Sequence, residues 1–180
     1  MFVYLLTRQY GYLNGFDYLW RYSQGDSPLT PESVHMALTE PTGWSASLVD
    51  LAGQLRAVVT SYQAGEIEHT VLEQRVDGLT DEIRQLAKKI RKDQLLEFID
   101  QRKDAKLEGY SKASSVEDLL ALTDELNQLA VRIHDGLSGY SNQDVSRVIS
   151  VDDLSEPSFD SMSKGVDRLA KVIKGSVDRL

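Results

Sequence analysis

Few residues in this sequence have side chains that could do chemistry. It contains no cysteine, three histidines, no Gly-x-Ser-x-Gly motif and no phosphate-binding glycine-rich loop. The lack of cysteine excludes a thiol nucleophile, a disulfide framework and any cysteine-ligated metal site. The missing motifs remove the usual signatures of serine hydrolases and nucleotide-binding enzymes. We therefore predict no catalytic residue and identify no small-molecule substrate.

Two Glu-x-x-His patterns are the residues with metal-ligand spacing: Glu32 with His35, and Glu66 with His69. On a helix this spacing puts a carboxylate and an imidazole on one face, and two such pairs with two further glutamates form the di-iron site of ferritin-like bundles. The two further glutamates are not identifiable. A site built from all three histidines, with His134 as the third, lacks a closely spaced pair. A helical-bundle metal protein stays an alternative, and no metal or other cofactor is predicted.

A seven-residue repeat of apolar side chains between residues 48 and 90 predicts a long helical seam, because alternating steps of three and four are typical of coiled coils. Gly65 and His69 interrupt the repeat. His69, between Glu66 and Glu73, could fix the register of an assembly and make it respond to mild acid. The predicted partner-binding seam consists of Leu48, Leu51, Leu55, Val58, Tyr62, His69, Leu72, Val76, Leu79, Ile83, Leu86 and Ile90.

Gly65 leaves two interpretations of this region. The phase of the repeat is unbroken across Gly65, which favours one rod from residue 47 past residue 100, about 80 Å long. A turn at Gly65 would instead give an antiparallel pair of helices over residues 47–63 and 66–101. We favour the rod, because a glycine inside a long helix costs only about 1 kcal/mol relative to alanine.

The first 22 residues contain eight of the fourteen aromatic side chains. Asn14-Gly15 lies between two aromatic runs and favours a type I′ turn, so we predict a β-hairpin. Asn14 as a helix N-cap is the rival interpretation. The predicted hairpin either packs on the helices as part of the hydrophobic core or offers a binding surface to a partner protein.

Proline, glycine and serine set the other predicted boundaries. A short helix begins at Pro31 and ends near Pro41 and Gly43. Residues 103–113 form a connection, and a capping box at Ser114 and Glu117 opens a helix that stops near Gly136 or Gly139. The last predicted helix, residues 163–180, has an apolar stripe that consists of Val166, Leu169, Val172, Ile173 and Val177.

Charge is unevenly distributed along the chain, whose net charge is −8. Residues 111–160 carry ten acidic and three basic side chains, whereas residues 161–180 carry two and five. This balance disfavours nucleic acid as a partner. The basic C-terminal helix is predicted to dock on the chain's own acidic segment or on another anionic surface, and a peripheral membrane protein anchored by it is a further alternative. We interpret the basic run over residues 84–92 as a solvated face.

The predicted fold is mainly α, with long coiled-coil-like helices that form a hairpin or bundle. Its segments are an aromatic N-terminal part (1–41), a long-helix core (42–138), a linker (139–161) and an amphipathic C-terminal helix (162–180). A long apolar seam has to be covered. The predicted function is therefore a non-enzymatic scaffold or adaptor that self-associates or binds a partner protein, in the cytoplasm.

Overall fold

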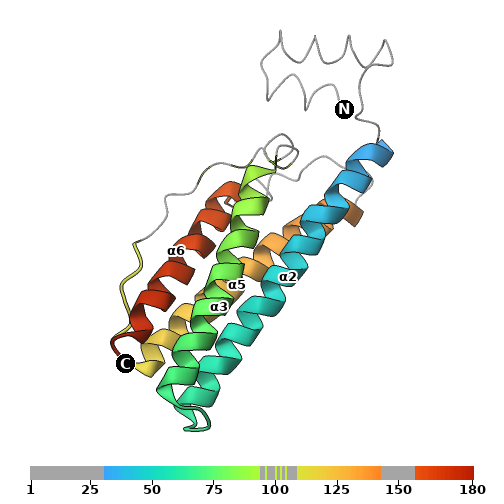
Figure 1. The fold of residues 1–180 in the computed structure, drawn as a ribbon. Helices are drawn as coiled ribbons and strands as arrows, with labels where there is room; N and C mark the ends of the chain where they lie inside the picture. The colour runs from blue at the N-terminus through green and yellow to red at the C-terminus, as the bar shows by residue number, and fades with distance from the viewer. Residues whose placement is uncertain are drawn as a thin grey trace.

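The computed structural model describes residues 31–93, 96, 100, 102, 104, 109–142 and 157–180, without the side chains of residues 31–38 and 140–142. These residues are mainly helical, which confirms the predicted class. Their four helices are α2 (Pro31–Gln63), α3 (His69–Lys92), α5 (Val116–Asn142) and α6 (Phe159–Val177), shown in Figure 1. The predicted N-terminal β-hairpin lies outside the described residues.

The rod predicted through Gly65 is wrong, because the chain turns there. Gly65 has a φ of +73°, which favours glycine. Its N–H bonds to the carbonyl of Tyr62 at 3.0 Å, and the N–H of Glu66 bonds to the carbonyl of Ser61 at 2.9 Å. These two bonds are those of a Schellman motif, which ends a helix and reverses the chain. The turn folds the two halves of the apolar repeat against each other, so that both halves line one core.

The four described helices form an antiparallel bundle in which α2 and α6 each pack against α3 and α5 (Figure 1). As residue numbers rise along α2, those of the contacted α5 residues fall, which shows that the two helices are antiparallel. The contacts are Ser45–His134, Arg56–Asp124 and Gln63–Glu117. Arg84–Asp167 and Asp77–Lys174 show the same for α3 and α6. Because α3 and α5 therefore run in the same direction, residues 93–115 connect opposite ends of the bundle.

Helix α2 continues through Pro41 and Gly43, where the sequence predicted an end. Proline removes one backbone bond of the helix. Pro41 is nevertheless buried, and Ser45 in the next turn bonds across to α5. We infer that this packing keeps the segment helical.

Three other boundaries differ from their predictions. The cap of α5 lies one residue later than predicted: Ser115 Oγ accepts the N–H of Asp118, whose carboxylate accepts the N–H of Ser114. The helix passes both predicted stops, Gly136 and Gly139, and ends at Asn142. Helix α6 begins at Phe159 instead of residue 163, because Ser158 caps it.

The apolar repeat forms the core of this single chain. Fully or nearly fully buried members of the predicted seam are Leu48, Leu55, Val58, Leu72, Val76, Ile83 and Ile90. The partly buried members are Leu51, Tyr62, His69, Leu79 and Leu86. Of the predicted C-terminal stripe, Val166, Leu169, Ile173 and Val177 are buried and Val172 is partly exposed. The seam predicted for a partner is thus largely covered by the chain's own helices.

Candidate functional site

A pocket of about 360 Å³ lies beside the N-terminus of α6 and the C-terminal part of α3. Its charged wall contains Asp100 and Arg102, whose side chains are 5% and 6% exposed. The Arg102 guanidinium donates to both carboxylate oxygens of Asp100, at 2.8 and 3.1 Å. It also stacks 4.0 Å from the ring centre of Phe159, whose backbone N–H donates to Asp100. The pair thus fastens the chain after α3 to the first turn of α6.

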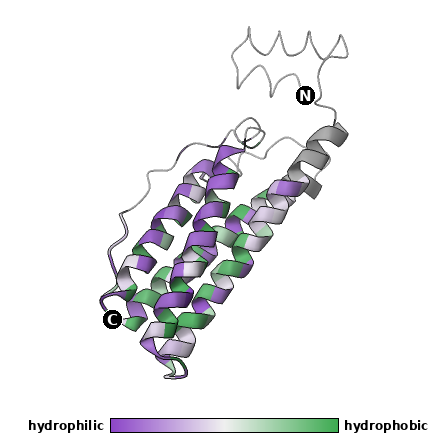
Figure 2. Cartoon of the chain, in the orientation of Figure 1, coloured by the Kyte–Doolittle hydropathy of each residue, from purple (hydrophilic) through white to green (hydrophobic). Residues whose placement is uncertain are grey.

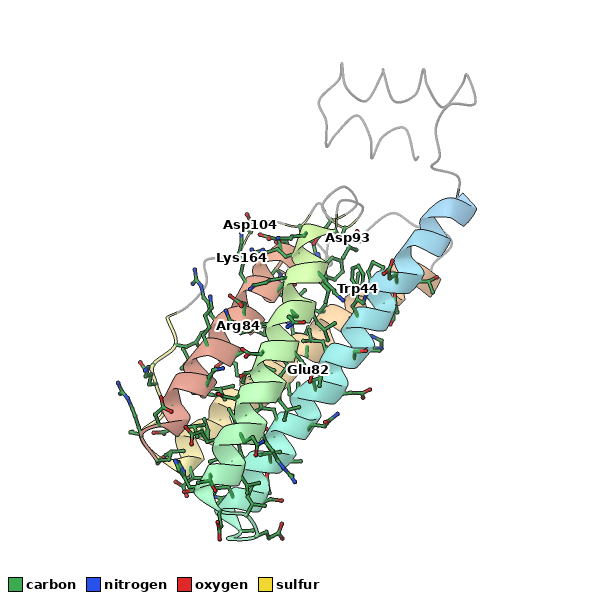
Figure 3. The ribbon with its side chains drawn as sticks, viewed as in Figure 1. Trp44, Glu82, Arg84, Asp93, Asp104 and Lys164 are labelled. Atoms are coloured by element: carbon green, nitrogen blue, oxygen red, sulfur yellow. The ribbon has the colours of Figure 1, made fainter. Side chains whose placement is uncertain are left out.

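Asp104 makes a second contact with the same helix end. It accepts hydrogen bonds from the hydroxyls of Ser158, at 2.8 Å, and Ser161, at 3.2 Å. These two bonds, with the nearby Lys164 ammonium, hold the pKa of Asp104 below its usual value despite some desolvation (Figure 3). Carboxylates at a helix N-terminus are stabilised by the free N–H groups there. The chain's own Asp100 and Asp104 therefore occupy the position that an external anion would take.

The opposite end of α6 is fastened by residues just before α5. The N–H of Ala113 donates to Ser176 Oγ at 2.9 Å. The Lys112 ammonium lies so close to Gly175 that a β-carbon there would come within 3.0 Å of it. Thus the connection between α3 and α5 contacts both ends of α6, and these polar groups position a helix.

Basic side chains of α6 pair with acidic residues of α3. Lys174 Nζ lies 3.3 Å from carboxylate oxygens of both Asp77 and Asp81. A pair of the opposite sense joins the same two helices, since Arg84 of α3 donates to Asp167 of α6 at 3.0 Å. The sequence predicted that the basic C-terminal helix docks on the acidic segment of residues 111–160. The acidic partners of Lys174 belong instead to α3. The apolar stripe of α6 is packed in the bundle, so membrane binding through this stripe would require the helix to detach.

The histidines lie apart. His134 Nδ1 is 2.9 Å from Ser45 Oγ, which donates its own hydrogen to the carbonyl of Thr42. Ser45 must therefore accept from His134, and its hydroxyl is not poised as a nucleophile. His69 lies beside the Tyr62 ring at the other end of α2, 17 residues away, or about 26 Å along the helix. No group of three metal-ligating side chains occurs among the described residues, and the side chain of His35 is not among them.

The outer surfaces of α2 and α3 form a continuous side of the bundle, which we call the α2–α3 face (Figures 1 and 2). On α2 most of its residues are small, with the exposed Asp50 among them, and a β-carbon added at Gly43 or Gly53 would touch nothing within 4 Å. On α3 it is charged and largely hydrophilic (Figure 2). The α2 residues are Gly43, Ala46, Asp50, Gly53 and Ala57, and the charged α3 residues are Arg75, Glu82 and Lys89, which are spaced one heptad apart and end beside Trp44 of α2.

Sequence reasoning missed this face, although two signals were present. Small residues recur on α2 at helical spacing, from Gly43 to Ala57. On α3 the basic run was interpreted as a solvated face paired with acids such as Asp81, Glu82 and Asp93, and not as part of a binding surface. Trp44, labelled in Figure 3, lies partly exposed beside the face. Lys89 Nζ lies 5.9 Å from the centre of its ring.

Comparison with known protein families, with curated proteins and with solved structures gives no match. The fold of the described residues defines the class, an antiparallel bundle of four helices. None of these helices is both long and apolar enough to cross a membrane.

Proposed function

We propose that the protein is a non-enzymatic assembly or adaptor protein that uses the α2–α3 face to bind another protein or a second copy of itself. The observation that carries the proposal is the combination of surfaces on this face. The small side chains on α2 allow close approach of another helix, and the charged side chains, Asp50 on α2 and those on α3, can set its orientation. The cytoplasm remains the predicted compartment.

The burial of the apolar repeat changes how such binding would occur. Coiled-coil association through Leu48, Leu72 and Ile83 would require the bundle to open, because these side chains are fully buried. The α2–α3 face needs no such opening. A partner would therefore add to the folded bundle, and binding would not compete with folding.

Trp44 gives this face an aromatic anchor. Tryptophan is enriched among residues that dominate binding energy, because its large ring buries much apolar area while its N–H can donate. Lys89 Nζ lies 5.9 Å from the centre of the Trp44 ring, and Lys89 is exposed. A partner that carries a carboxylate could pair with Lys89 while it covers the Trp44 ring.

Photo-crosslinking from defined positions tests the proposal. A photoreactive amino acid replaces Ala57 or Gln85, both exposed on the face, and in a control it replaces Gln128, exposed on α5. We expect one defined protein adduct from the two face positions and none from Gln128. Adducts of equal yield from all three positions, or from none, would contradict binding through this face.

A further inference from the structure

Exposed charges alternate in sign along the side of α3 that lies next to α2. Lys89 is on this side, because its ammonium lies beside the Trp44 ring of α2. Glu82 and Arg75 precede it by seven and fourteen residues, and all three are exposed. Since seven residues make nearly two helical turns, these side chains share one side of α3 at intervals of about 10 Å. From Arg75 to Lys89 the order is base, acid, base.

This alternation does not stabilise α3 itself. Ion pairs within a helix form between residues three or four positions apart. No charged residue occupies those positions around Arg75 or Glu82. Asp81 and Arg84, on the side of α3 that faces α6, pair with that helix, but among the described residues no ion pair involves Arg75, Glu82 or Lys89. The charges next to α2 are therefore available to a second molecule.

Uncharged side chains lie on the α2 side of the same junction, by which we mean the line along which α2 and α3 pack (Figure 1). Trp44 contacts α3, and Leu51 and Val58 follow it at seven-residue intervals. Residues three positions apart are neighbours on a helix surface. The residues three positions after this row are Ser47, Gln54 and Ser61. Two stripes with the same seven-residue interval, one charged and one uncharged, thus flank the junction.

We propose that the α2–α3 face binds one helix of another protein, which lies along this junction and carries an acid, a base and an acid at seven-residue intervals on its side toward α3. This inference rests on the proposed function and names the chemistry of the partner. A seven-residue interval is typical of helices that pack side by side, and charges that flank such a contact select the partner. Each of the three partner charges then meets an opposite charge of α3.

Asp50 adds to the preference for a base in the middle of the partner helix. Trp44 of α2 lies level with Lys89 of α3. Because the turn at Gly65 makes the two helices antiparallel, Asp50, six residues after Trp44, lies level with Glu82, seven before Lys89. Two carboxylates at one level attract a cation more strongly than one does. Neither carboxylate has an ion-pair partner in the described part of the chain.

Trp44 sets the direction of the partner helix. The order acid, base, acid is the same in both directions, so charge alone does not orient it. Trp44 lies at one end of the junction, beside Lys89. An apolar side chain next to one terminal acid of the partner would cover the Trp44 ring while that acid pairs with Lys89. Gly43, just before Trp44, leaves room for it, since a β-carbon there would touch nothing within 4 Å.

Two synthetic peptides of equal composition test this order. Each is a helix three heptads long, held by a side-chain crosslink, with alanine over α2 and leucine at one end. The first has Glu, Lys and Glu at the positions that face α3, and the second has Lys, Glu and Glu. In either direction the second peptide sets two like charges against α3, whereas the first sets none. We expect the first to bind about tenfold more tightly in fluorescence anisotropy, with a smaller preference at high salt.

Charge reversal on the protein tests the middle position. Glu82→Lys should weaken the first peptide about threefold, because it reverses one contact, and a third peptide with three glutamates should regain this affinity. Glu73→Lys makes the same charge change at an exposed position one turn before Asp77, which pairs with α6. This control should leave the affinities of all three peptides as in the wild type. Circular dichroism should show the wild-type helix content in both variants.

The outcomes separate this inference from the proposed function. Equal affinity for the first two peptides, or binding of neither, overturns the charge order, while photo-adducts from Ala57 or Gln85 would still support binding through the face. Because α3 itself carries acid, base and acid at Glu68, Arg75 and Glu82, a second copy is the competing occupant. Adducts that join two copies of the chain would overturn a different protein as the partner. A lack of adducts from both positions would contradict the proposed function as well.

Discussion

At the scale of single residues, the two histidines with described side chains have opposite environments. His134 bonds to Ser45 and lies 3.5 Å from Ser138, so it joins α2 to α5. His69 has a buried Nδ1 without a hydrogen-bond partner among the described residues. An unpaired buried polar atom costs about 1–3 kcal/mol, whereas a paired one stabilises.

This contrast predicts opposite effects for the same substitution. His69→Leu should raise the free energy of unfolding by about 1 kcal/mol, because it removes the unpaired nitrogen and keeps the apolar contact with Tyr62. His134→Leu should lower it by about 1 kcal/mol, because the buried Ser45 hydroxyl loses its bond to His134 and keeps only its bond to the Thr42 carbonyl. Urea denaturation followed by circular dichroism measures both. A loss of stability in His69→Leu would show that Nδ1 has an unrecognised partner.

At the scale of elements, the approach of α6 to α5 depends on one glycine. A β-carbon at Gly136 would lie 2.9 Å from Cε1 of Phe159, whose ring is 1% exposed and held under Arg102. The ring has little room to move. The sequence suggested Gly136 as a possible helix stop, but it lies within α5 and admits a side chain from α6.

We therefore predict that Gly136→Ala destabilises the protein. Alanine favours a helix over glycine by about 1 kcal/mol, but forcing atoms into a packed core costs about 1–3 kcal/mol. The expected net loss is about 1 kcal/mol in the free energy of unfolding, measured by denaturant titration. Gly139→Ala, in the same helix and with nothing within 4 Å, should be neutral or stabilising. A stabilised Gly136→Ala variant would contradict the close contact.

Helix formation was predictable because apolar spacing determines it locally, and the apolar residues from Leu48 to Ile90 are indeed mostly core. Whether a helix stops was less predictable. Gly65 and Gly136 are the same residue type, but the first turns the chain and the second lies against Phe159 inside a helix. Pro41 likewise lies in a helix that packs on α5. Such outcomes depend on contacts distant in sequence, which periodicity does not contain.

The candidate binding face was not predicted for a related reason. Hydrophobicity identifies the residues that become buried. The apolar seam therefore led to a predicted binding surface that the folded chain covers with its own helices. Small exposed residues such as Gly53 and Ala57 have no such signal until the structure shows which side of α2 lies outward.

At the scale of the whole molecule, ionised carboxylates join α6 to α3 and to the connection that follows α3. Burial opposes ionisation of Asp167, but bonds to Lys171 and Arg84 outweigh it and lower its pKa. The hydroxyls of Ser158 and Ser161 lower the pKa of Asp104. Both carboxylates therefore stabilise the folded state most when they are ionised.

This linkage predicts an acid-sensitive bundle. A carboxylate with a lowered folded pKa contributes its full stabilisation above its unfolded pKa, about 3.9, and loses it as pH falls through the folded value. The free energy of unfolding should therefore decline below about pH 4, measured by urea titration at pH 7, 4 and 3. The double variant Asp104→Asn with Asp167→Asn should show a shallower decline. An identical decline would place the acid-sensitive groups elsewhere.

The position of α6 in the bundle also governs how the chain can be made. Ribosomes synthesise α2, α3 and α5 before α6, yet Ile83, Ile90 and Ile133 belong to the same buried cluster as the apolar face of α6. Until those later residues emerge, the nascent bundle exposes an apolar groove along its length. The growing chain is then a substrate for chaperones, and a premature stop before α6 would yield a product prone to aggregate.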